Sequence, residues 1–406
     1  MLSETSSAVK PKGDHTRICL LAQRLTESPA FVYDEGAILR ALRALEQLRA
    51  TAECRILFAL KSCAVAHVLS LIAPHVDGFA TSSLFEATLA RQVIGDMGTV
   101  HMTTPGLRPD EIRAIAQKCD YVSFNSLSQW EQLRGEVGNS VECGLRINPQ
   151  LSFLEDERYD PCRKHSKLGV PLDQLVGLLK TDPGRLSAVR GVHFHTNCES
   201  DDLAPVLKTV RHVEAGLGGF LGKLAWVNIG GGYLVEQAEN RTCLHKAVGL
   251  LKDTHGVEVF FEPGAAVVRE AGYLMTTVLD MFDSGGWTIA VLDTTVNHAP
   301  EVFEYQYRPA VLGDCADGRH RYVLAGCTCL AGDLFGEYAF EEPLQVGSRV
   351  VFSGMGAYTL VKAHMFNGVN LPAVYALTAD GDLSVKKRFS YSDFASRCGA
   401  DGNVPV

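Results

Sequence analysis

A lysine stands directly after an apolar run in the first part of the sequence. The run is Ile56–Leu60 (ILFAL), and the lysine is Lys61. A lysine at the end of a buried strand is partly removed from water, which lowers the pKa of its amine and lets that amine form an imine with a carbonyl compound. The ordinary alternative is a solvated lysine that ends a strand. The role of Lys61 therefore depends on the residues that the fold brings next to it.

Two glycine turns follow apolar runs further along the chain. Gly230–Gly232 follows the run AWVNI, and Gly264 closes the turn that begins with Glu262. Glycines leave backbone N–H groups uncovered, so such a turn can hold a phosphate, although a flexible turn is the simpler interpretation. Glu262 could cap its turn or, beside a phosphate site, keep the nitrogen of a bound pyridine ring protonated.

Two histidines with metal-ligand character lie close together at His193 and His195, and Cys198 and Glu199 follow them. On a strand the two histidines would share a face, as in half of a zinc site. No matching Cys or His pair with metal-ligand spacing stands elsewhere in the first two thirds of the chain, so we predict no metal. His195 could instead stack its flat ring on a cofactor, while His193 suits a core position.

The last third of the chain holds a thiol and a carboxylate close together in Gly326–Asp333 (GCTCLAGD), at Cys329 and Asp333. A buried structural cysteine is the commoner role for such a thiol, and the pair Cys327 and Cys329 is a poor metal motif. Tyr358, in the segment MGAYT, could pack in the core or donate its hydroxyl to a phosphate.

These residues need a fold that places them together. Eight short β-rich runs alternate mostly with helical patterns, which favours a closed parallel (β/α)8 barrel of the TIM type. Reactive residues stand where several of these runs end, which is the catalytic rim of such a barrel. The predicted strands are Arg55–Lys61, Val76–Thr81, Thr99–Thr104, Tyr121–Asn125, Val141–Asn148, Val189–His195, Leu224–Ile229 and Val257–Phe261.

The pattern of predicted secondary structure changes near Ala271. Short β-type runs separated by Gly, Asp and Pro turns follow, which predicts a mainly antiparallel β domain over residues 271–406. The barrel is expected over residues 31–270. In the N-terminal segment, residues 1–30, we predict disorder for the first dozen residues and packing of the remainder against the β domain.

Composition sets the broad class of protein. The 406 residues carry a net charge of −9 and contain 46% hydrophobic and 21% charged residues, as in soluble globular proteins. We find no basic cluster for nucleic acid and no apolar run of membrane-spanning length. The twelve cysteines are scattered, and the polar N-terminus lacks the apolar core of a signal peptide. We therefore predict a cytoplasmic enzyme with reduced thiols that acts on a small molecule.

Together these segments resemble the fold-type III pyridoxal-phosphate decarboxylases, the alanine-racemase-like group that includes ornithine and diaminopimelate decarboxylases. Within that group the chain is most similar to the carboxynorspermidine/carboxyspermidine decarboxylases. The resemblance runs from about residue 30 to residue 372 and is specific through the order and spacing of its segments. Those segments are FALKSCA, GFATSSLFEA, VSFNSLSQW, LRINP, YDPC, SKLGV, GVHFHTNCE, WVNIGGGY, FEPG, IAVLDTTVNH, YRP, TCLAGDLFGEY and MGAYTLVKAHMFNGV.

The resemblance implies pyridoxal 5'-phosphate as cofactor and assigns roles to the matching positions. Lys61 would hold the cofactor as an imine, His195 would stack on its ring, and Glu262 would pair with the ring nitrogen. The phosphate would be bound by Gly230, Gly231, Gly232, Gly264 and Tyr358.

The resemblance also implies a homodimer with active sites at the interface. Cys329 and Asp333 would then come from the other subunit, where Asp333 would contact the substrate. The Cys329 thiol would protonate the α-carbon after carbon dioxide leaves.

Some positions depart from the close relatives. Ala265 replaces a glutamate after the EPG turn, Gly356-Ala357 replaces an Ala-His pair, and Arg163-Lys164-His165 brings basic character between YDPC and SKLGV. A polyamine-like substrate is a polycation that requires carboxylates nearby, so these changes favour a less cationic substrate, with Lys164 and His165 as candidate contacts. Neutral drift is the alternative.

Two substrate classes therefore stay open. One is a carboxynorspermidine-like diamino acid, for whose amine Glu301 and Glu304 (HAPEVFEYQYRP) still offer carboxylates. The other is N-citrylornithine, a siderophore precursor that carries carboxylates. An amino-acid racemase would need an opposing tyrosine in the β domain. A non-catalytic regulatory relative is disfavoured because Lys61, Glu262 and Cys329 are all present.

Overall fold

The chain divides into two compact units in the computed structural model, which describes residues 15–236 and 238–400. One, here called the barrel unit, is residues 39–267. The other, the β unit, joins residues 15–38 to residues 268–400. The disorder predicted for the first dozen residues lies outside the described residues.

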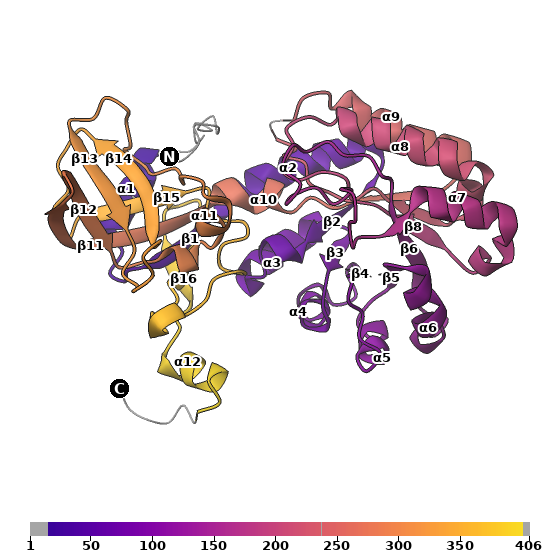
Figure 1. The fold of residues 1–406 in the computed structure, drawn as a ribbon, viewed down its shortest axis with the longest axis horizontal. Helices are drawn as coiled ribbons and strands as arrows, with labels where there is room; N and C mark the ends of the chain where they lie inside the picture. The colour runs from indigo at the N-terminus through magenta and orange to yellow at the C-terminus, as the bar shows by residue number, and fades with distance from the viewer. Residues whose placement is uncertain (1–14, 237, 401–406) are drawn as a thin grey trace. The chain divides into compact units, whose positions relative to one another are not determined.

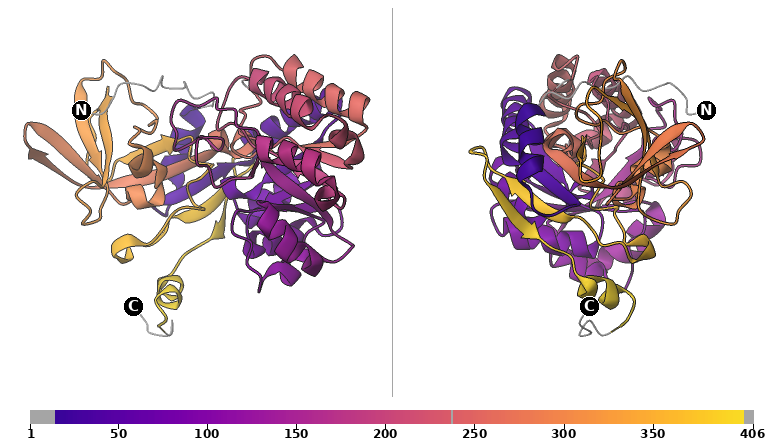
Figure 2. Two further views of the ribbon diagram at one scale, coloured as in Figure 1. Left: turned by 45° about the vertical axis from the view of Figure 1, so that its right-hand side comes forward. Right: turned by 90° about the vertical axis from the view of Figure 1, so that its left-hand side faces the viewer.

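The barrel unit contains a closed ring of eight parallel strands that pair in chain order, and the last strand pairs with the first. Helices lie on the outer side of the strands (Figures 1 and 2). The predicted (β/α)8 barrel is therefore confirmed. Its strands are β2 Arg55–Ala59, β3 Gly78–Thr81, β4 Thr99–Thr103, β5 Tyr121–Phe124, β6 Glu142–Asn148, β8 Gly191–His193, β9 Trp226–Asn228 and β10 Glu258–Phe261.

Helices alternate with the barrel strands, and α2 precedes the first of them. Serine side chains cap two of them: Ser83 accepts from the Glu86 N–H and Ser126 from the Gln129 N–H, which satisfies backbone donors at each helix start. A short strand, β7 (Val170–Pro171), pairs with β6 outside the ring. The helices are α2 Glu35–Ala52, α3 Ala66–Ile72, α4 Leu84–Ile94, α5 Ile112–Ala116, α6 Leu127–Val137, α7 Leu172–Thr181, α8 Ala204–Leu217 and α9 Thr242–His255.

Aromatic rings fill the inside of the barrel. The Trp226 indole packs against the rings of Tyr121 and Phe260. A Cβ atom on Gly191 would lie 2.0 Å from the Trp226 ring, so glycine on the neighbouring strand gives the indole its space. His101 stacks on Tyr121 with ring centroids 4.1 Å apart. The barrel therefore has a packed core rather than an open channel.

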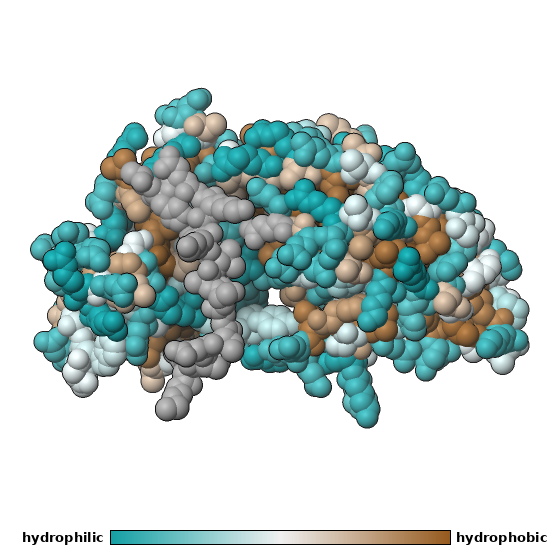
Figure 3. Space-filling view, turned by 90° about the horizontal axis from the view of Figure 1, so that it is seen from above, coloured by the Kyte–Doolittle hydropathy of each residue, from teal (hydrophilic) through white to brown (hydrophobic). Residues whose placement is uncertain are grey.

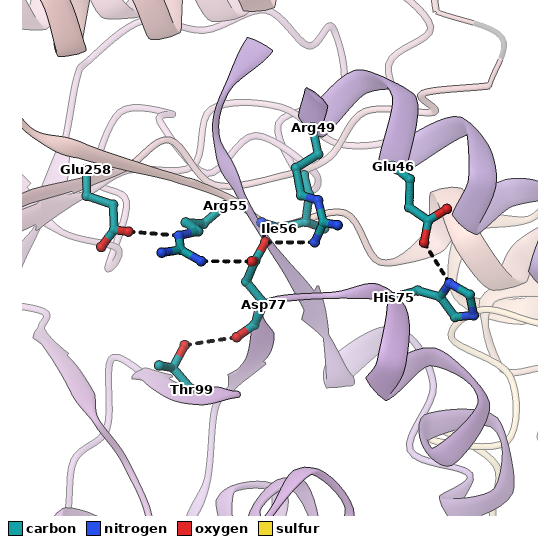
Figure 4. Close-up of polar contacts among 8 residues, drawn as sticks. All are labelled: Glu46, Arg49, Arg55, Ile56, His75, Asp77, Thr99 and Glu258. Atoms are coloured by element: carbon teal, nitrogen blue, oxygen red, sulfur yellow. Dashed lines mark hydrogen bonds and ion pairs between the residues drawn. The ribbon is translucent and has the colours of Figure 1, made fainter. Parts of the chain in front are cut away.

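A network of charged side chains joins the amino-terminal ends of the barrel strands (Figure 4). This end lies opposite the rim at which the predicted reactive residues stand. The Asp77 carboxylate accepts a hydrogen bond from the Ile56 N–H at 2.8 Å and pairs with Arg49 at 3.4 Å and with Arg55 at 3.1 Å. Arg55 also pairs with Glu258 at 2.9 Å. Asp77 thus ties α2 and β2 to the start of β3, at the end of a barrel that contributes to stability rather than to catalysis.

The β unit is built on an eight-stranded sheet whose main path runs β14-β13-β12-β11-β1-β16-β17, with β15 paired to β11. Five of its pairings are antiparallel and two are parallel, β12 with β13 and β1 with β16. The predicted mainly antiparallel domain is confirmed. The strands are β1 Ala30–Asp34, β11 Gly272–Ser284, β12 Trp287–Leu292, β13 His320–Ala325, β14 Leu334–Phe340, β15 Arg349–Ser353, β16 Ala373–Leu377 and β17 Leu383–Lys387.

The N-terminal elements belong to the β unit. Helix α1 (His15–Arg24) buries Ile18 and Leu21 in a core with Tyr273 and Met275 of β11. Strand β1 pairs with β11 and β16, so the barrel unit begins at residue 39 rather than at residue 31. The sequence pattern alone placed β1 with the barrel because its partners lie more than 200 residues later. Short helices in or next to this unit are α10 Ala265–Val268, α11 Glu301–Tyr305 and α12 Tyr391–Arg397.

The surface seen in Figure 3 is mostly hydrophilic, with hydrophobic residues in scattered patches. Such scattered exposure of apolar side chains is ordinary for a globular protein. Within residues 15–236 and 238–400 no helix combines the length and the apolar character needed to cross a bilayer.

Candidate active site

Three polar side chains lie in register on neighbouring strands of the barrel. Arg146 on β6 is paired with His193 on β8, and His193 is paired with Asn228 on β9. All three are buried. A polar layer inside an apolar barrel is costly unless its groups serve one another or a ligand. This layer therefore marks the interior end of a binding site.

Lys61 lies in a short 3-10 turn, Leu60–Ser62, rather than on the strand that was predicted to reach it. Its side chain keeps access to solvent although protein atoms surround it closely. These surroundings lower the pKa of the Lys61 amine; Glu262 opposes the effect and Arg146 adds to it. A larger fraction of this amine is therefore neutral and nucleophilic than in an ordinary lysine.

Glu262 follows β10 and is 7% exposed. One carboxylate oxygen, Oε1, accepts a hydrogen bond from Asn228 Nδ2 at 2.7 Å, and the other lies 3.6 Å from His193 Nε2. Burial opposes ionisation of Glu262, but the neighbouring His193 and Lys61 outweigh it and keep the pKa of this carboxyl below its ordinary value. Glu262 is therefore a carboxylate at neutral pH, ready to pair with a protonated ring nitrogen.

His195 has a defined neutral form. The Gly231 N–H donates to His195 Nδ1 at 3.1 Å, so this nitrogen is the acceptor and the proton belongs on Nε2. Burial, Lys61 and Arg146 hold the pKa of His195 well below its ordinary value. A neutral flat ring fixed on one edge is suited to stacking.

The Gly230–Gly232 turn is packed tightly between neighbouring strand ends. A Cβ on Gly231 would lie 1.9 Å from the Glu262 carbonyl oxygen, and one on Gly232, where φ is +92°, would lie 2.1 Å from the Asn197 carbonyl oxygen. A residue larger than glycine does not fit at these positions, so the glycines are required by packing and not only by flexibility. The Gly230 N–H donates to Asn228 Oδ1 at 2.9 Å, and the Gly231 N–H donates to His195. These two N–H groups already donate to side chains of the protein. Phosphate binding by all three glycines therefore stays a prediction.

The second glycine turn connects Glu262 to the strand that leads to Lys61. The Ala59 N–H donates to the Pro263 carbonyl at 3.1 Å, and a Cβ on Gly264 would lie 2.9 Å from Ser62 Oγ. The residues on either side of Lys61 are therefore held directly against the Glu262–Gly264 turn.

The zinc alternative gains no support from the geometry. Among residues 15–236 and 238–400, no group of three or more His, Cys, Asp or Glu side chains is arranged to hold a metal ion. The His193 ring is fully buried and faces Glu262, with its Nε2 atom 3.6 Å from a carboxylate oxygen. The core position expected for His193 is confirmed by this burial.

Arg163, Lys164 and His165 are exposed on a loop of the barrel unit. The same loop reaches the site through Cys162, whose thiol donates to the His195 carbonyl at 3.7 Å. These basic residues therefore directly follow Cys162, the residue that contacts the His195 carbonyl. Their role as substrate contacts stays a prediction.

In the β unit, Cys329 is exposed on a loop that other side chains hold in place. The Cys329 N–H donates to Asn367 Oδ1 at 2.9 Å. Asp333 is buried, and its carboxylate accepts from the Val296 N–H at 2.8 Å, from the Thr328 N–H at 3.0 Å and from the Thr328 hydroxyl. With these donors in place, Asp333 shapes the Cys329 loop.

Two predicted substrate contacts, Glu301 and Glu304, lie on α11, and both pair with Lys362. Phe303, between them, packs against the Cys329 loop, because a Cβ on Gly332 would lie 2.8 Å from its ring. Tyr358 is half-buried with φ of +56°, a backbone conformation that is rare outside glycine and common at functional sites.

The barrel unit fits pyridoxal 5'-phosphate on four counts. It offers an accessible amine with a lowered pKa at Lys61, an ionised carboxylate at Glu262 and a neutral ring at His195. The Gly230–Gly232 turn lies next to the last two of these. A barrel with these groups at the carboxyl ends of its strands defines a pyridoxal-phosphate enzyme of the fold-type III class.

Comparison with known proteins identifies the family. Residues 35–269 match the family described as pyridoxal-dependent decarboxylase, pyridoxal binding domain. The chain is 36% identical to a carboxyaminopropylagmatine decarboxylase of Synechocystis, over 92% of this chain and 95% of that protein. It is 33% identical to a carboxynorspermidine/carboxyspermidine decarboxylase of Herminiimonas arsenicoxydans, over 92% and 99% of the two chains.

The fold agrees. The crystal structure of carboxynorspermidine decarboxylase from Campylobacter jejuni, complexed with norspermidine, superposes with a TM-score of 0.83 at 29% identity and covers 91% of this chain and all of that one. The chain belongs to the pyridoxal-dependent decarboxylase family and is a pyridoxal-phosphate-dependent amino-acid decarboxylase.

The sequence analysis missed two residues that the structure places in the site, Arg146 and Asn228. Arg146 is a charged residue inside an apolar strand, CGLRIN, and this anomaly could have identified it. Asn228 precedes the glycine turn and looked like an ordinary strand residue. Only the pairing of β9 with β10 brings it next to Glu262.

Proposed function

We propose that this enzyme removes the α-carboxyl group of an amino acid whose far end is a cationic amine or guanidine. The observation that carries this proposal is the pair of carboxylates on α11, Glu301 and Glu304, beside the Cys329 loop. Relatives that cover nearly the whole chain are named for carboxyaminopropylagmatine and for carboxynorspermidine or carboxyspermidine. A carboxylated polyamine or carboxylated agmatine derivative fits both facts, which would place the enzyme in polyamine biosynthesis.

Lys61 is the residue proposed to hold the cofactor covalently through its aldehyde. The lowered pKa of the amine favours this reaction at neutral pH. When bound, pyridoxal phosphate supplies a protonated ring that accepts the electron pair left behind by carbon dioxide. The chain must therefore hold that ring, keep it protonated and return a proton to the substrate.

Glu262 is proposed to keep the ring nitrogen protonated, because it is ionised and fixed by Asn228. His195 is proposed to lie flat against the ring, since Gly231 fixes its neutral form. Gly230–Gly232, Gly264 and Tyr358 are proposed to surround the phosphate.

Cys329 is proposed to return the proton to the α-carbon, as a general acid. Its thiol is exposed, as a group that works on a substrate must be, and Asn367 and Asp333 hold its loop. We also propose that the enzyme is a cytoplasmic homodimer in which this loop serves the partner's site. Mixing inactive Lys61→Ala protein with inactive Cys329→Ala protein should then restore part of the activity, and light scattering should give the mass of two chains.

A second substrate, N-citrylornithine, has one observation in its favour. The exposed basic residues Lys164 and His165 stand on the loop whose Cys162 contacts the His195 carbonyl. Cationic side chains there could meet a substrate that carries carboxylates. This candidate predicts that Lys164→Ala raises KM for N-citrylornithine and leaves KM for polyamine-like substrates unchanged.

A carbon dioxide release assay tests the proposal. The purified, cofactor-loaded enzyme is given carboxyaminopropylagmatine, carboxynorspermidine, carboxyspermidine, N-citrylornithine, ornithine and diaminopimelate in turn. We expect the highest kcat/KM among the first three. Higher turnover of N-citrylornithine would replace the proposal by the second candidate, and no turnover of any compound would refute both.

A matched pair of variants tests the role of Lys61. Lys61→Ala should lose turnover and the near-visible absorbance of the bound cofactor. Lys252→Ala, which removes a lysine paired with Glu53 at the opposite end of the barrel, should keep both.

A further inference from the structure

A lysine of the β unit lies in a cage built from two carboxylates and an aromatic ring. Lys362 Nζ is 3.3 Å from Glu301 Oε1, contacts Glu304 Oε2, and lies 5.3 Å from the centre of the Tyr305 ring. The three cage residues come from α11, whereas Lys362 comes from a segment about sixty residues later. Carboxylates and an aromatic face are the groups that bind alkylammonium ions in proteins.

Hydrogen bonds fix the Lys362 segment against the elements that carry the cage and Cys329. The His364 N–H donates to the Asn297 carbonyl at 3.1 Å, just before α11. The Cys329 N–H donates to Asn367 at 2.9 Å, just after Lys362. The Val296 N–H donates to Asp333 at 2.8 Å. The cage and the Cys329 loop are therefore parts of one assembly.

The position of Lys362 is set by charge. Glu301 and Glu304 are three residues apart on a helix, so their side chains share a face and repel each other. Lys362 lies against both and is 29% exposed, so much of its charge is shielded from solvent. Burial opposes the charged form of Lys362, yet Glu304 and Glu301 raise the pKa of its amine above the ordinary value. Summed over Glu301, Glu304 and Lys362 alone, the lysine changes the charge from −2 to −1.

We propose that Lys362 is a specificity-determining residue that limits how strongly the α11 carboxylates attract a cationic substrate end. The inference rests on the proposed function, because it takes Glu301 and Glu304 as the groups that meet that end. With Lys362 in place, the cage is less negative by one unit of charge. It therefore binds the cationic end of a substrate moderately and releases a polyamine product readily.

The test measures the binding of norspermidine to the cofactor-loaded enzyme by calorimetry at low salt. If affinity follows the net charge of the cage, Lys362→Met (net −2) should bind norspermidine about tenfold more tightly than wild type. Glu304→Gln (net 0) should bind about tenfold more weakly. The double variant Glu304→Gln/Lys362→Met (net −1) should return to near the wild-type affinity, and so should Lys362→Arg.

A matched lysine serves as control. Lys387 pairs with Asp393 at 3.1 Å in the same unit, away from α11 in the sequence, so Lys387→Met should leave norspermidine binding unchanged. The difference between Lys362→Met and wild type should also shrink at 0.5 M salt, because ions screen exposed charges. Increased affinity in Lys362→Met that is absent from Lys387→Met would support the proposal.

Two results would overturn the inference. One is equal or weaker norspermidine binding by Lys362→Met; the other is a double variant that binds no better than Glu304→Gln. Either would mean that Lys362 only clamps α11. Calorimetry needs no turnover, so this outcome is distinct from failure of the proposed function, which the carbon dioxide assay reports.

Discussion

Asn228 donates a hydrogen bond from its side-chain amide to Glu262 at 2.7 Å and accepts one from the Gly230 N–H at 2.9 Å. One buried amide thus connects the carboxylate proposed for the ring nitrogen to the first residue of the glycine turn. The residues proposed for the two ends of the cofactor are thus held by the same side chain. Asn228 itself need not touch the cofactor to determine how well the site is formed.

Replacing Asn228 should weaken cofactor binding. Asn228→Ala removes a buried hydrogen bond to a charged group, which is worth about 1.5–3 kcal/mol, so we expect the Kd for pyridoxal phosphate to rise about 10- to 100-fold. Fluorescence titration of the cofactor-free enzyme measures this. Asn240→Ala is the control, because Asn240 makes the same kind of bond to Asp202 at 2.8 Å on the surface. Equal Kd values in the two variants would contradict the prediction.

Replacing Asp333 tests whether this residue shapes the loop or contacts substrate. Asp333→Asn places an amide where three donors converge, so the Cys329 loop should shift and kcat should fall at least about tenfold, with KM little changed. Asp314→Asn, which disturbs a carboxylate elsewhere in the β unit, should leave kcat near the wild-type value. A large rise in KM confined to cationic substrates would instead indicate substrate contact.

Acid should destabilise the barrel through its buried histidines. Burial lowers the pKa of His101 to about 3 from an ordinary 6.5. Between these values the unfolded chain takes up a proton that the folded chain does not, so stability falls as pH falls. For this residue alone the loss from pH 7 to pH 5 is about 2 kcal/mol. Denaturant unfolding at the two pH values should show a smaller loss for His101→Phe, whereas the exposed His212→Asn should behave as wild type.

Asp77 should matter for stability and not for catalysis. Asp77→Ala leaves the Ile56 N–H, Arg49 and Arg55 without their shared partner, so we expect the free energy of unfolding to fall by about 2–3 kcal/mol. The activity per folded molecule should be unchanged. Asp110→Ala removes an exposed pair with Arg108 and should have no measurable effect on stability. A loss of kcat in Asp77→Ala at a temperature where it is fully folded would show that the prediction is wrong.

Local pattern was enough to predict the barrel. Each of its eight strands overlaps a predicted run, because a strand buried on both faces must be apolar and must end in turn residues. The same reasoning predicted that Lys61, His195, Gly230–Gly232 and Glu262 share a rim. It did not place β1 in the β unit, because sheet pairing depends on partners distant in sequence.

The sequence by itself determined the fold class through its pattern of strands and helices, and its resemblance to the decarboxylase family implied the pyridoxal-phosphate chemistry and the candidate site residues. Tertiary structure decided how the groups act on each other. It placed Asn228 against Glu262, made Gly231 the donor to His195, directed the Val296 N–H to Asp333 and set Lys362 between Glu301 and Glu304. Each of these is a contact between residues well apart in the chain, and only the packing of the folded chain brings such residues within hydrogen-bonding distance.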